Sequence, residues 1–131
     1  FDGVNWPPED REALLARIAE ARFVAGNEEQ ARADADATLQ LYREQRETIQ
    51  DFWRGAALRP LAEAYVTMGA DAEALKVYRI AAEEGTSNPN ARTRCIDLVA
   101  NCLSMALRDV QPDANLEARL RKTREGLGDP W

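Results

Sequence analysis

Residues 61–85 read LAEAYVTMGADAEALKVYRIAAEEG, and this stretch decides the fold class. Two alanine-rich apolar segments meet at residues 68–71, MGAD. Alanine, leucine and glutamate are strong helix formers, whereas glycine readily ends a helix. The stretch therefore predicts two amphipathic helices joined by a tight turn at Gly69.

A second glycine turn, at Gly26, lies 43 residues before Gly69 and is flanked by the same residue types. An alanine precedes each glycine by seven positions, and another follows it by five. The four matched residues are Ala19, Ala31, Ala62 and Ala74. Small side chains let two helices cross closely, and repeated hairpins of this kind stack into one continuous core. The spacing thus indicates an internal repeat.

Residues 58–81 resemble one unit of a tetratricopeptide repeat (TPR). The match rests on small, large and aromatic residues at the spacings of that motif: Leu58, Leu61, Ala62, Tyr65, Gly69, Ala74, Tyr78 and Ala81. Residues 15–42 are similar but degraded, because Arg22 stands where the first-helix aromatic residue belongs. The repeat is longer than the ~34 residues usual for TPR units, which resembles the long-helix variants of bacterial regulators and adaptors. The resemblance implies antiparallel helix hairpins stacked as a short right-handed superhelix.

The rest of the chain also favours helix, and we expect an all-α fold of about six helices. They should cover residues 9–25, 28–47, 48–68, 71–84, 90–107 and a last segment that begins at Pro112. Pro60 lies inside the third helix and should kink or restart it. The expected layout is an N-terminal arm or linker over 1–8, a TPR-like domain over 9–127 and a tail over 128–131. Its approximate units are 9–47, 48–85 and 90–127. The third unit lacks a glycine turn, so its register stays open, and a non-repeating six-helix bundle remains the alternative.

The composition argues against an enzyme. The 131 residues include no histidine, which removes the usual general base, the Ser-His and Cys-His pairs and the commonest zinc ligand. Cys95 and Cys102 would lie about 10.5 Å apart along one helix, too far for a disulfide, and we interpret both as small core residues. We therefore expect no catalytic residue, no cofactor and no metal.

The formal net charge of −6 argues against non-specific binding to nucleic acid. A basic cluster in the last helix nevertheless keeps a nucleic-acid-binding regulator as a third hypothesis: Arg119, Arg121, Lys122 and Arg124. No segment approaches the ~20 apolar residues that cross a bilayer. A cytoplasmic location is favoured, with the periplasm open if a signal peptide was removed before Phe1.

The resemblance also implies a concave groove lined by the first helix of each hairpin. It nominates nine partner-binding residues: Glu20, Phe23 and Val24 in the first unit, Arg59, Glu63, Val66 and Thr67 in the second, and Arg94 and Asn101 in the third. The lysine and asparagine clamp that some TPR proteins use for a C-terminal carboxylate is absent, so we expect a basic or amphipathic protein segment as partner. Arg59→Glu should weaken that binding while the melting temperature holds.

Residues 90–107 predict an amphipathic helix with two distinct stripes. The apolar stripe should face the core: Cys95, Leu98, Val99, Cys102, Leu103 and Ala106. The polar stripe is either the solvated side of the helix or a ligand-facing groove: Arg94, Asp97, Asn101, Ser104 and Arg108. Elsewhere, Trp53 with Phe52 should pack between units, and Trp6 and Trp131 should cap the core or meet a neighbouring domain.

These features favour a non-catalytic adaptor, scaffold or regulatory domain that binds a protein or peptide segment in a helical groove. A second hypothesis is a helical subunit that self-associates as a homo-oligomer or docks to another domain of its own chain. The identity of the partner does not follow from the residues.

Overall fold

The computed structural model describes residues 5–128, which form six α-helices and one short 3-10 turn. The elements are α1 (Pro8–Val24), α2 (Glu28–Gln45), η1 (Arg46–Thr48), α3 (Asp51–Thr67), α4 (Asp71–Thr86), α5 (Ala91–Leu107) and α6 (Ala114–Glu125). No strand occurs in this part of the chain, so the expected all-α class with six helices is confirmed. Residues 1–4 of the expected arm and residues 129–131 of the expected tail, including Trp131, lie outside the described residues.

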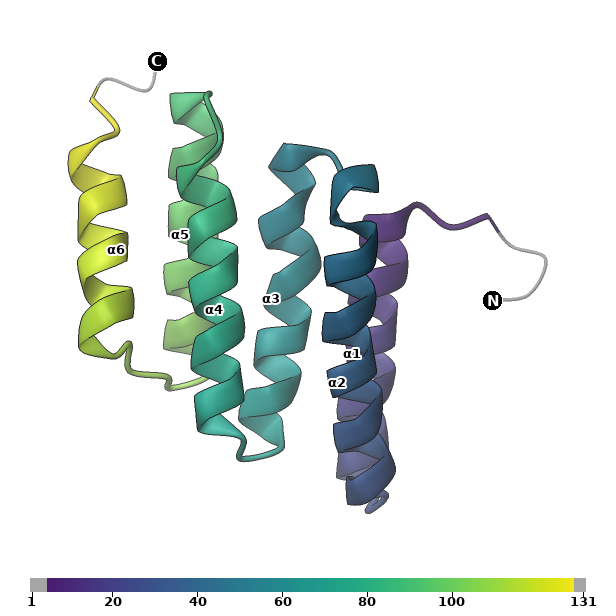
Figure 1. The fold of residues 1–131 in the computed structure, drawn as a ribbon. Coiled ribbons are helices and arrows are strands. Elements are labelled where there is room, and N and C mark those ends of the chain that lie inside the picture. The colour runs from purple at the N-terminus through teal and green to yellow at the C-terminus, as the bar shows by residue number, and fades with distance from the viewer. Residues whose placement is uncertain (1–4, 129–131) are drawn as a thin grey trace.

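The six helices form three hairpins that stand side by side in chain order (Figure 1). α3 packs against α1, α4 and α5, and α6 packs against α4 and α5. The central hairpin α3–α4 is therefore covered on both sides. The hairpin α1–α2 stands at one end of the row and α5–α6 at the other, so each has a face that no described helix covers (Figure 1).

The three hairpin turns share one hydrogen-bond pattern. Gly26, Gly69 and Asp109 each adopt a positive φ, of 95°, 69° and 54° respectively. In each turn the amide after this residue donates to the carbonyl five residues before it: Asn27 to Arg22, Ala70 to Tyr65, and Val110 to Met105. This is the Schellman arrangement that ends helices. Its turn residue has a left-handed backbone conformation, which aspartate is among the few non-glycine residues to adopt. Asp109 thus fixes the register of the third hairpin, 40 residues after Gly69.

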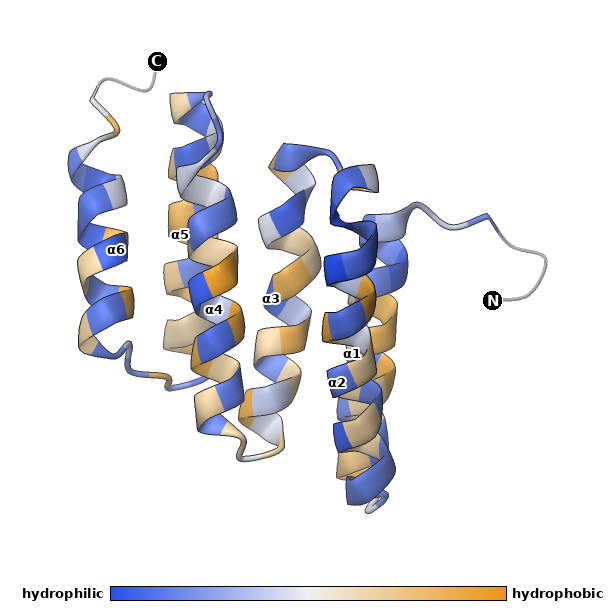
Figure 2. Ribbon diagram, viewed as in Figure 1, coloured by the Kyte–Doolittle hydropathy of each residue, from blue (hydrophilic) through white to orange (hydrophobic). Residues whose placement is uncertain are grey.

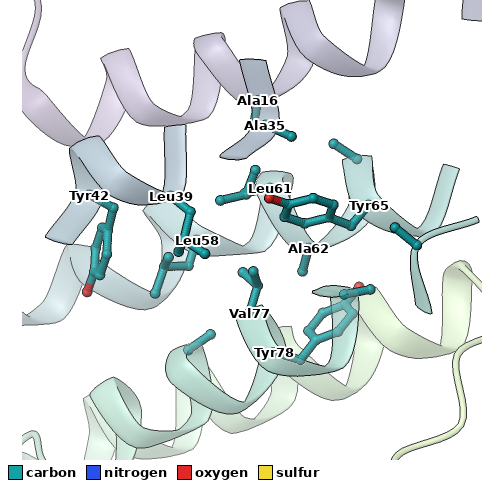
Figure 3. Packing of buried hydrophobic residues seen from close by; sticks show 14 of the residues in the cluster. Ala16, Ala35, Leu39, Tyr42, Leu58, Leu61, Ala62, Tyr65, Val77 and Tyr78 are labelled. Atoms are coloured by element: carbon teal, nitrogen blue, oxygen red, sulfur yellow. The ribbon is translucent and has the colours of Figure 1, made fainter. Parts of the chain in front are cut away.

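The hydrophobic core lies mainly among the first four helices (Figure 3). Alanines at the helix crossings are completely buried: Ala16, Ala19, Ala31, Ala35, Ala62, Ala64 and Ala81. Larger buried side chains surround them: Leu39, Leu58, Leu61, Tyr65, Val77 and Tyr78 (Figure 3). To this cluster of buried residues α5 supplies Met105 and α6 supplies Leu116. The third hairpin is therefore held by much less apolar burial than the first two, and other contacts must attach it.

Three local expectations differ from the structure. α3 continues through Pro60 without ending or restarting there. α6 begins at Ala114 rather than at Pro112, because the Asp113 carboxylate caps the helix by accepting the Leu116 amide at 2.8 Å. The rings of Phe52 and Trp53 do not pack between units. They contact each other at the first turn of α3, with centroids 4.9 Å apart, and both residues remain more than 40% exposed (42% and 45%).

Candidate functional site

The polar stripe of α5, and not its apolar stripe, faces the rest of the molecule. Asp97, Asn101 and Ser104 are buried, and they point toward α3 and α4. This corrects both sequence-based interpretations of the stripe as a solvated side or a ligand-facing groove. The physical reason is that α3 and α4 offer polar partners to each of these side chains, so their burial leaves few unpaired atoms.

Asp97 sits where α5 comes closest to the central hairpin. A Cβ atom added to Gly55 of α3 would lie 2.9 Å from Asp97 Oδ1, and one added to Gly85 of α4 would lie 3.1 Å from Asp97 Cβ. The two glycines therefore make room for this carboxylate between the helices. Arg59 Nη1 donates to Asp97 Oδ1 at 3.2 Å and to Asn101 Oδ1 at 3.1 Å. These contacts tie the middle of α5 to α3.

A second group of polar side chains, which we call the Arg108 network, joins α1, α3 and α5. It comprises Arg17, Glu20, Glu63, Thr67, Ser104 and Arg108. Arg108 donates through Nη1 to Glu20 Oε1 at 2.6 Å and to Thr67 Oγ1 at 2.9 Å, and through Nη2 to Glu63 Oε2 at 3.3 Å. The Thr67 hydroxyl donates to Glu20 Oε1 at 2.6 Å. The last turn of α5 is thus anchored to both preceding hairpins.

Ser104 extends the Arg108 network into the core. Its hydroxyl donates to Glu63 Oε1 at 2.9 Å and lies 2.8 Å from the Tyr78 hydroxyl, which is left to donate to Ser104. In α1, Arg17 pairs with both glutamates: its Nη1 lies 3.1 Å from Glu20 Oε2 and its Nη2 lies 3.0 Å from Glu63 Oε2. Each glutamate therefore meets two guanidinium groups, a network of charge-assisted bonds rather than an isolated surface pair.

The two polar clusters shift pKa values in opposite directions. Partial burial works to raise the pKa of Glu20, but hydrogen bonds from Arg108, Thr67 and Arg17 outweigh it, and that pKa is lowered. The hydrogen bond to Glu20 raises the pKa of Arg108. Burial dominates at Asp97 and raises the pKa of its carboxyl, although Arg59 opposes the change. The ion pairs around Arg108 are therefore firmly ionised, whereas Asp97 bears a desolvation cost that a single guanidinium only partly offsets.

The opposite face of α5 leaves four large apolar side chains open to solvent. We call Ile96, Val99, Leu103 and Leu107 the α5 stripe; their exposed fractions are 59%, 60%, 56% and 76%. The expectation that the apolar side of this helix faces the core is wrong. So is the interpretation of both cysteines as core residues, because Cys95 is half-buried and Cys102 is exposed. In Figure 2 the ribbon of α5 carries many apolar residues, whereas that of α6 is largely hydrophilic. Contiguous exposed apolar residues such as the α5 stripe mark interaction sites.

The shared turns show which positions of the three hairpins correspond. Val99, Leu103 and Leu107 lie ten, six and two residues before Asp109, and Arg59, Glu63 and Thr67 lie ten, six and two residues before Gly69. In α3 these three positions bond to α5 and are covered by it. In α5 the same positions are apolar and no described residue covers them. These exposed positions could have been predicted from the sequence, because alignment of Asp109 with Gly26 and Gly69 identifies them.

The nine residues nominated from the sequence fall into separate places. Glu20, Glu63 and Thr67 meet in the Arg108 network, and Arg59 meets Asn101 beside Asp97. The other four are dispersed: Phe23 lies under the Arg32 guanidinium, Val24 is exposed, Val66 packs partly on the core, and Arg94 Nη1 donates to the carbonyl of Asn88. Five of the nine therefore form hydrogen bonds between helices.

A groove opens at each end of the row of hairpins. The one between α5 and α6, beside the α5 stripe, has a volume of about 220 Å³ and is lined by Leu98, Cys102, Glu117, Leu120, Arg121 and Arg124. The one between α1 and α2 has a volume of about 470 Å³ and is lined by Leu15, Ile18, Arg22, Asp34, Ala37, Thr38, Gln40, Leu41 and Glu44. Both are lined by apolar side chains together with charged ones.

Two other features are absent among residues 5–128: a metal-binding cluster and a membrane-spanning helix. No cluster of three or more histidine, cysteine, aspartate or glutamate side chains in that range could hold a metal ion. None of the described helices is long and apolar enough to cross a membrane. The sequence matches no family model, and neither curated proteins nor solved structures give a significant match.

Proposed function

We propose that this chain is a non-catalytic protein-interaction domain, built as a short TPR-like stack of helix hairpins, whose binding surface is the α5 stripe. The observation that carries the proposal is the inversion of α5. The helix buries its polar side in hydrogen bonds and turns Ile96, Val99, Leu103 and Leu107 to solvent. Apolar side chains exposed in line on one helix favour docking of another protein surface, because their burial releases ordered hydration water.

The residues that the sequence nominated for a groove in α1 and α3 are already hydrogen-bonded, which supports the choice of the α5 stripe instead. Glu20, Arg59, Glu63 and Thr67 already bond to side chains of neighbouring helices. A partner that used them would have to replace bonds of about 1.5–3 kcal/mol each, because they involve charged groups. The α5 stripe has no such bonds to lose, so it favours binding at lower cost.

The test compares two variants of matched chemistry. The double variant Val99→Ser, Leu103→Ser removes the centre of the stripe, and Val24→Ser removes an exposed valine from α1 as the control. Each variant, and the unaltered protein, is immobilised and exposed to soluble extract of the source organism. Any retained protein is then purified and titrated, with amide hydrogen exchange to locate the contact.

Each aliphatic side chain buried on binding contributes roughly 1.5–3 kcal/mol, so the double variant should bind at least about tenfold more weakly. The Val24→Ser control should bind like the unaltered protein, and exchange protection should fall within α5. A partner that binds the double variant with unchanged affinity would place the interaction elsewhere and defeat the proposal.

A further inference from the structure

We propose that the partner of the α5 stripe is a second copy of this chain, stacked head to tail so that its α1–α2 end covers the α5–α6 end of the first. This inference rests on the proposed function, because it names the partner of the same surface. It follows from three features of the molecule: two unfilled end grooves, their opposite charge, and a packing pattern that the chain already repeats internally.

The packing pattern predicts which residues of the second copy would meet α5. Within the chain, α5 buries Asp97, Asn101 and Met105, which lie twelve, eight and four residues before the turn residue Asp109, and the first two of them bond to Arg59 of α3. The residues at those distances before Gly26 are Leu14, Ile18 and Arg22 of α1. Leu14 and Ile18 are only half-buried, because no described helix covers that side of α1.

The two faces match because both are apolar. One offers Leu14 and Ile18 of α1 with Leu41 of α2, and the other offers Val99 and Leu103 of α5. Within the chain the equivalent contact between α3 and α5 is polar, with Arg59 and Glu63 opposite Asp97 and Ser104. Between copies it would be apolar on both sides, so the same geometry would bury hydrophobic surface.

The rims of the two grooves carry opposite charge. α2 contains five acidic and two basic residues, whereas α6 contains four basic and two acidic residues. Among the residues that line the grooves, Arg22 pairs with Asp34, and Glu117 pairs with Arg121 at 2.8 Å. Of the charged residues that remain, the α1/α2 groove has the negative Glu44 and the α5/α6 groove has the positive Arg124. Opposite end charges steer copies into head-to-tail contact and disfavour the contact of like ends.

A head-to-tail contact of this kind uses two different surfaces and does not close on itself. It generates open chains of copies whose length rises with concentration, in contrast to the single dimer formed by a two-fold contact. This difference makes the inference testable with variants of either end.

The experiment uses sedimentation of four proteins and one mixture. Leu41→Glu places a carboxylate in the α1/α2 groove, Leu103→Glu places one on the α5 stripe, and Ala72→Glu adds the same charge on the exposed surface of the central hairpin as control. The unaltered protein and Ala72→Glu should show a mass that rises with concentration above 14.6 kDa. Leu41→Glu and Leu103→Glu should each stay monomeric. Their equimolar mixture should form a dimer of about twice the monomer mass and no larger species, because each variant keeps the end that the other has lost.

Three results would overturn the inference, and they are distinguishable from failure of the proposed function. Persistent dimers of Leu41→Glu, with Leu103→Glu monomeric, would show two α5 faces in contact. Failure of the mixture to form a dimer while both variants are folded would exclude head-to-tail stacking. A monomeric unaltered protein up to about 1 mM, the weak end of measurable affinity, would exclude self-association, and the proposed function would stand if another protein binds the stripe. If neither Leu41→Glu nor Leu103→Glu folds, Glu44→Arg and Arg124→Glu repeat the test with exposed charges, and each should weaken assembly alone.

Discussion

Glu12, a buried residue of α1, offers a quantitative test of the helix packing. Its residue is 1% exposed, and its Oε1 atom has no hydrogen-bond partner. Burial raises the pKa of this carboxyl from an ordinary 4.5 to about 7, although the Arg11 charge opposes the change. We predict that Glu12→Gln stabilises the fold in a pH-dependent way, because the amide has a similar shape and never ionises.

The size of the effect follows from the pKa difference between the folded and unfolded states. Each pKa unit corresponds to 1.36 kcal/mol, so a rise from 4.5 to about 7 corresponds to about 3 kcal/mol. The folded pKa is the higher one. The contribution of Glu12 is therefore fully present below pH 4.5 and is lost as the pH rises through about 7. Above that pH the ionised carboxylate is buried at its full cost.

Urea unfolding of the two proteins across this pH range measures the effect. Near pH 4 the free energies of unfolding should be similar, and near pH 8 the Glu12→Gln variant should be more stable by about 3 kcal/mol. Comparison of the two proteins cancels the titration of other groups, such as Glu20 and Asp97. A stability difference that stays constant from pH 4 to pH 8 would show that the Glu12 carboxyl ionises normally and is open to solvent.

Two further predictions concern the attachment of α5. Arg59→Glu should lower the free energy of unfolding by about 3–5 kcal/mol, because among residues 5–128 Arg59 alone supplies a guanidinium bonded to buried Asp97, and the variant adds a like charge. Chemical denaturation tests this, and an unchanged melting temperature would contradict it. Gly55→Ala should destabilise by about 1–3 kcal/mol, although alanine is the better helix former, because the new Cβ would press on Asp97. The double variant Gly55→Ala, Asp97→Ala relieves that contact, so Gly55→Ala should cost less in the Asp97→Ala background; equal costs would show that the close approach is absent.

The structure changes what is expected of Arg59 in particular. From the sequence, Arg59→Glu should have affected binding alone. The bonds from Arg59 to Asp97 and Asn101 make the residue structural as well, so loss of binding in this variant would not identify a contact with a partner. The α5 stripe and Val24, which make no such bonds in the described structure, separate binding from stability better.

The helices and the first two hairpins could be predicted because their signals are local. Gly26 and Gly69 mark turns by their own conformational freedom, and the alanines around them mark close crossings. The orientation of α5 could not be predicted in this way. An amphipathic pattern says that two faces differ, and burial of the apolar face is the default. Here the default fails because Arg59 and Glu63, about 40 residues away in sequence, provide partners for the polar face.

The third turn lies between these cases. Its positive φ belongs to Asp109, a residue that adopts the left-handed conformation more readily than most but that also occurs in every other context. The register of the third hairpin therefore depends on Asp109, but no glycine in the sequence identifies that residue as the turn. Once Asp109 is aligned with Gly69, the three apolar positions of α5 follow directly, and they differ from Arg94 and Asn101.

The most direct test of the inverted α5 compares two substitutions on its opposite faces, measured by urea unfolding at a protein concentration too low for association. Leu103→Asn changes a side chain that is 56% exposed, and Asn101→Leu changes one that is 1% exposed and bonded to Arg59. The structure predicts a change below about 0.5 kcal/mol for Leu103→Asn and a loss of about 1–3 kcal/mol for Asn101→Leu. The reverse order, with Leu103→Asn costly and Asn101→Leu neutral or stabilising, would show that the apolar face of α5 is buried and would contradict the account.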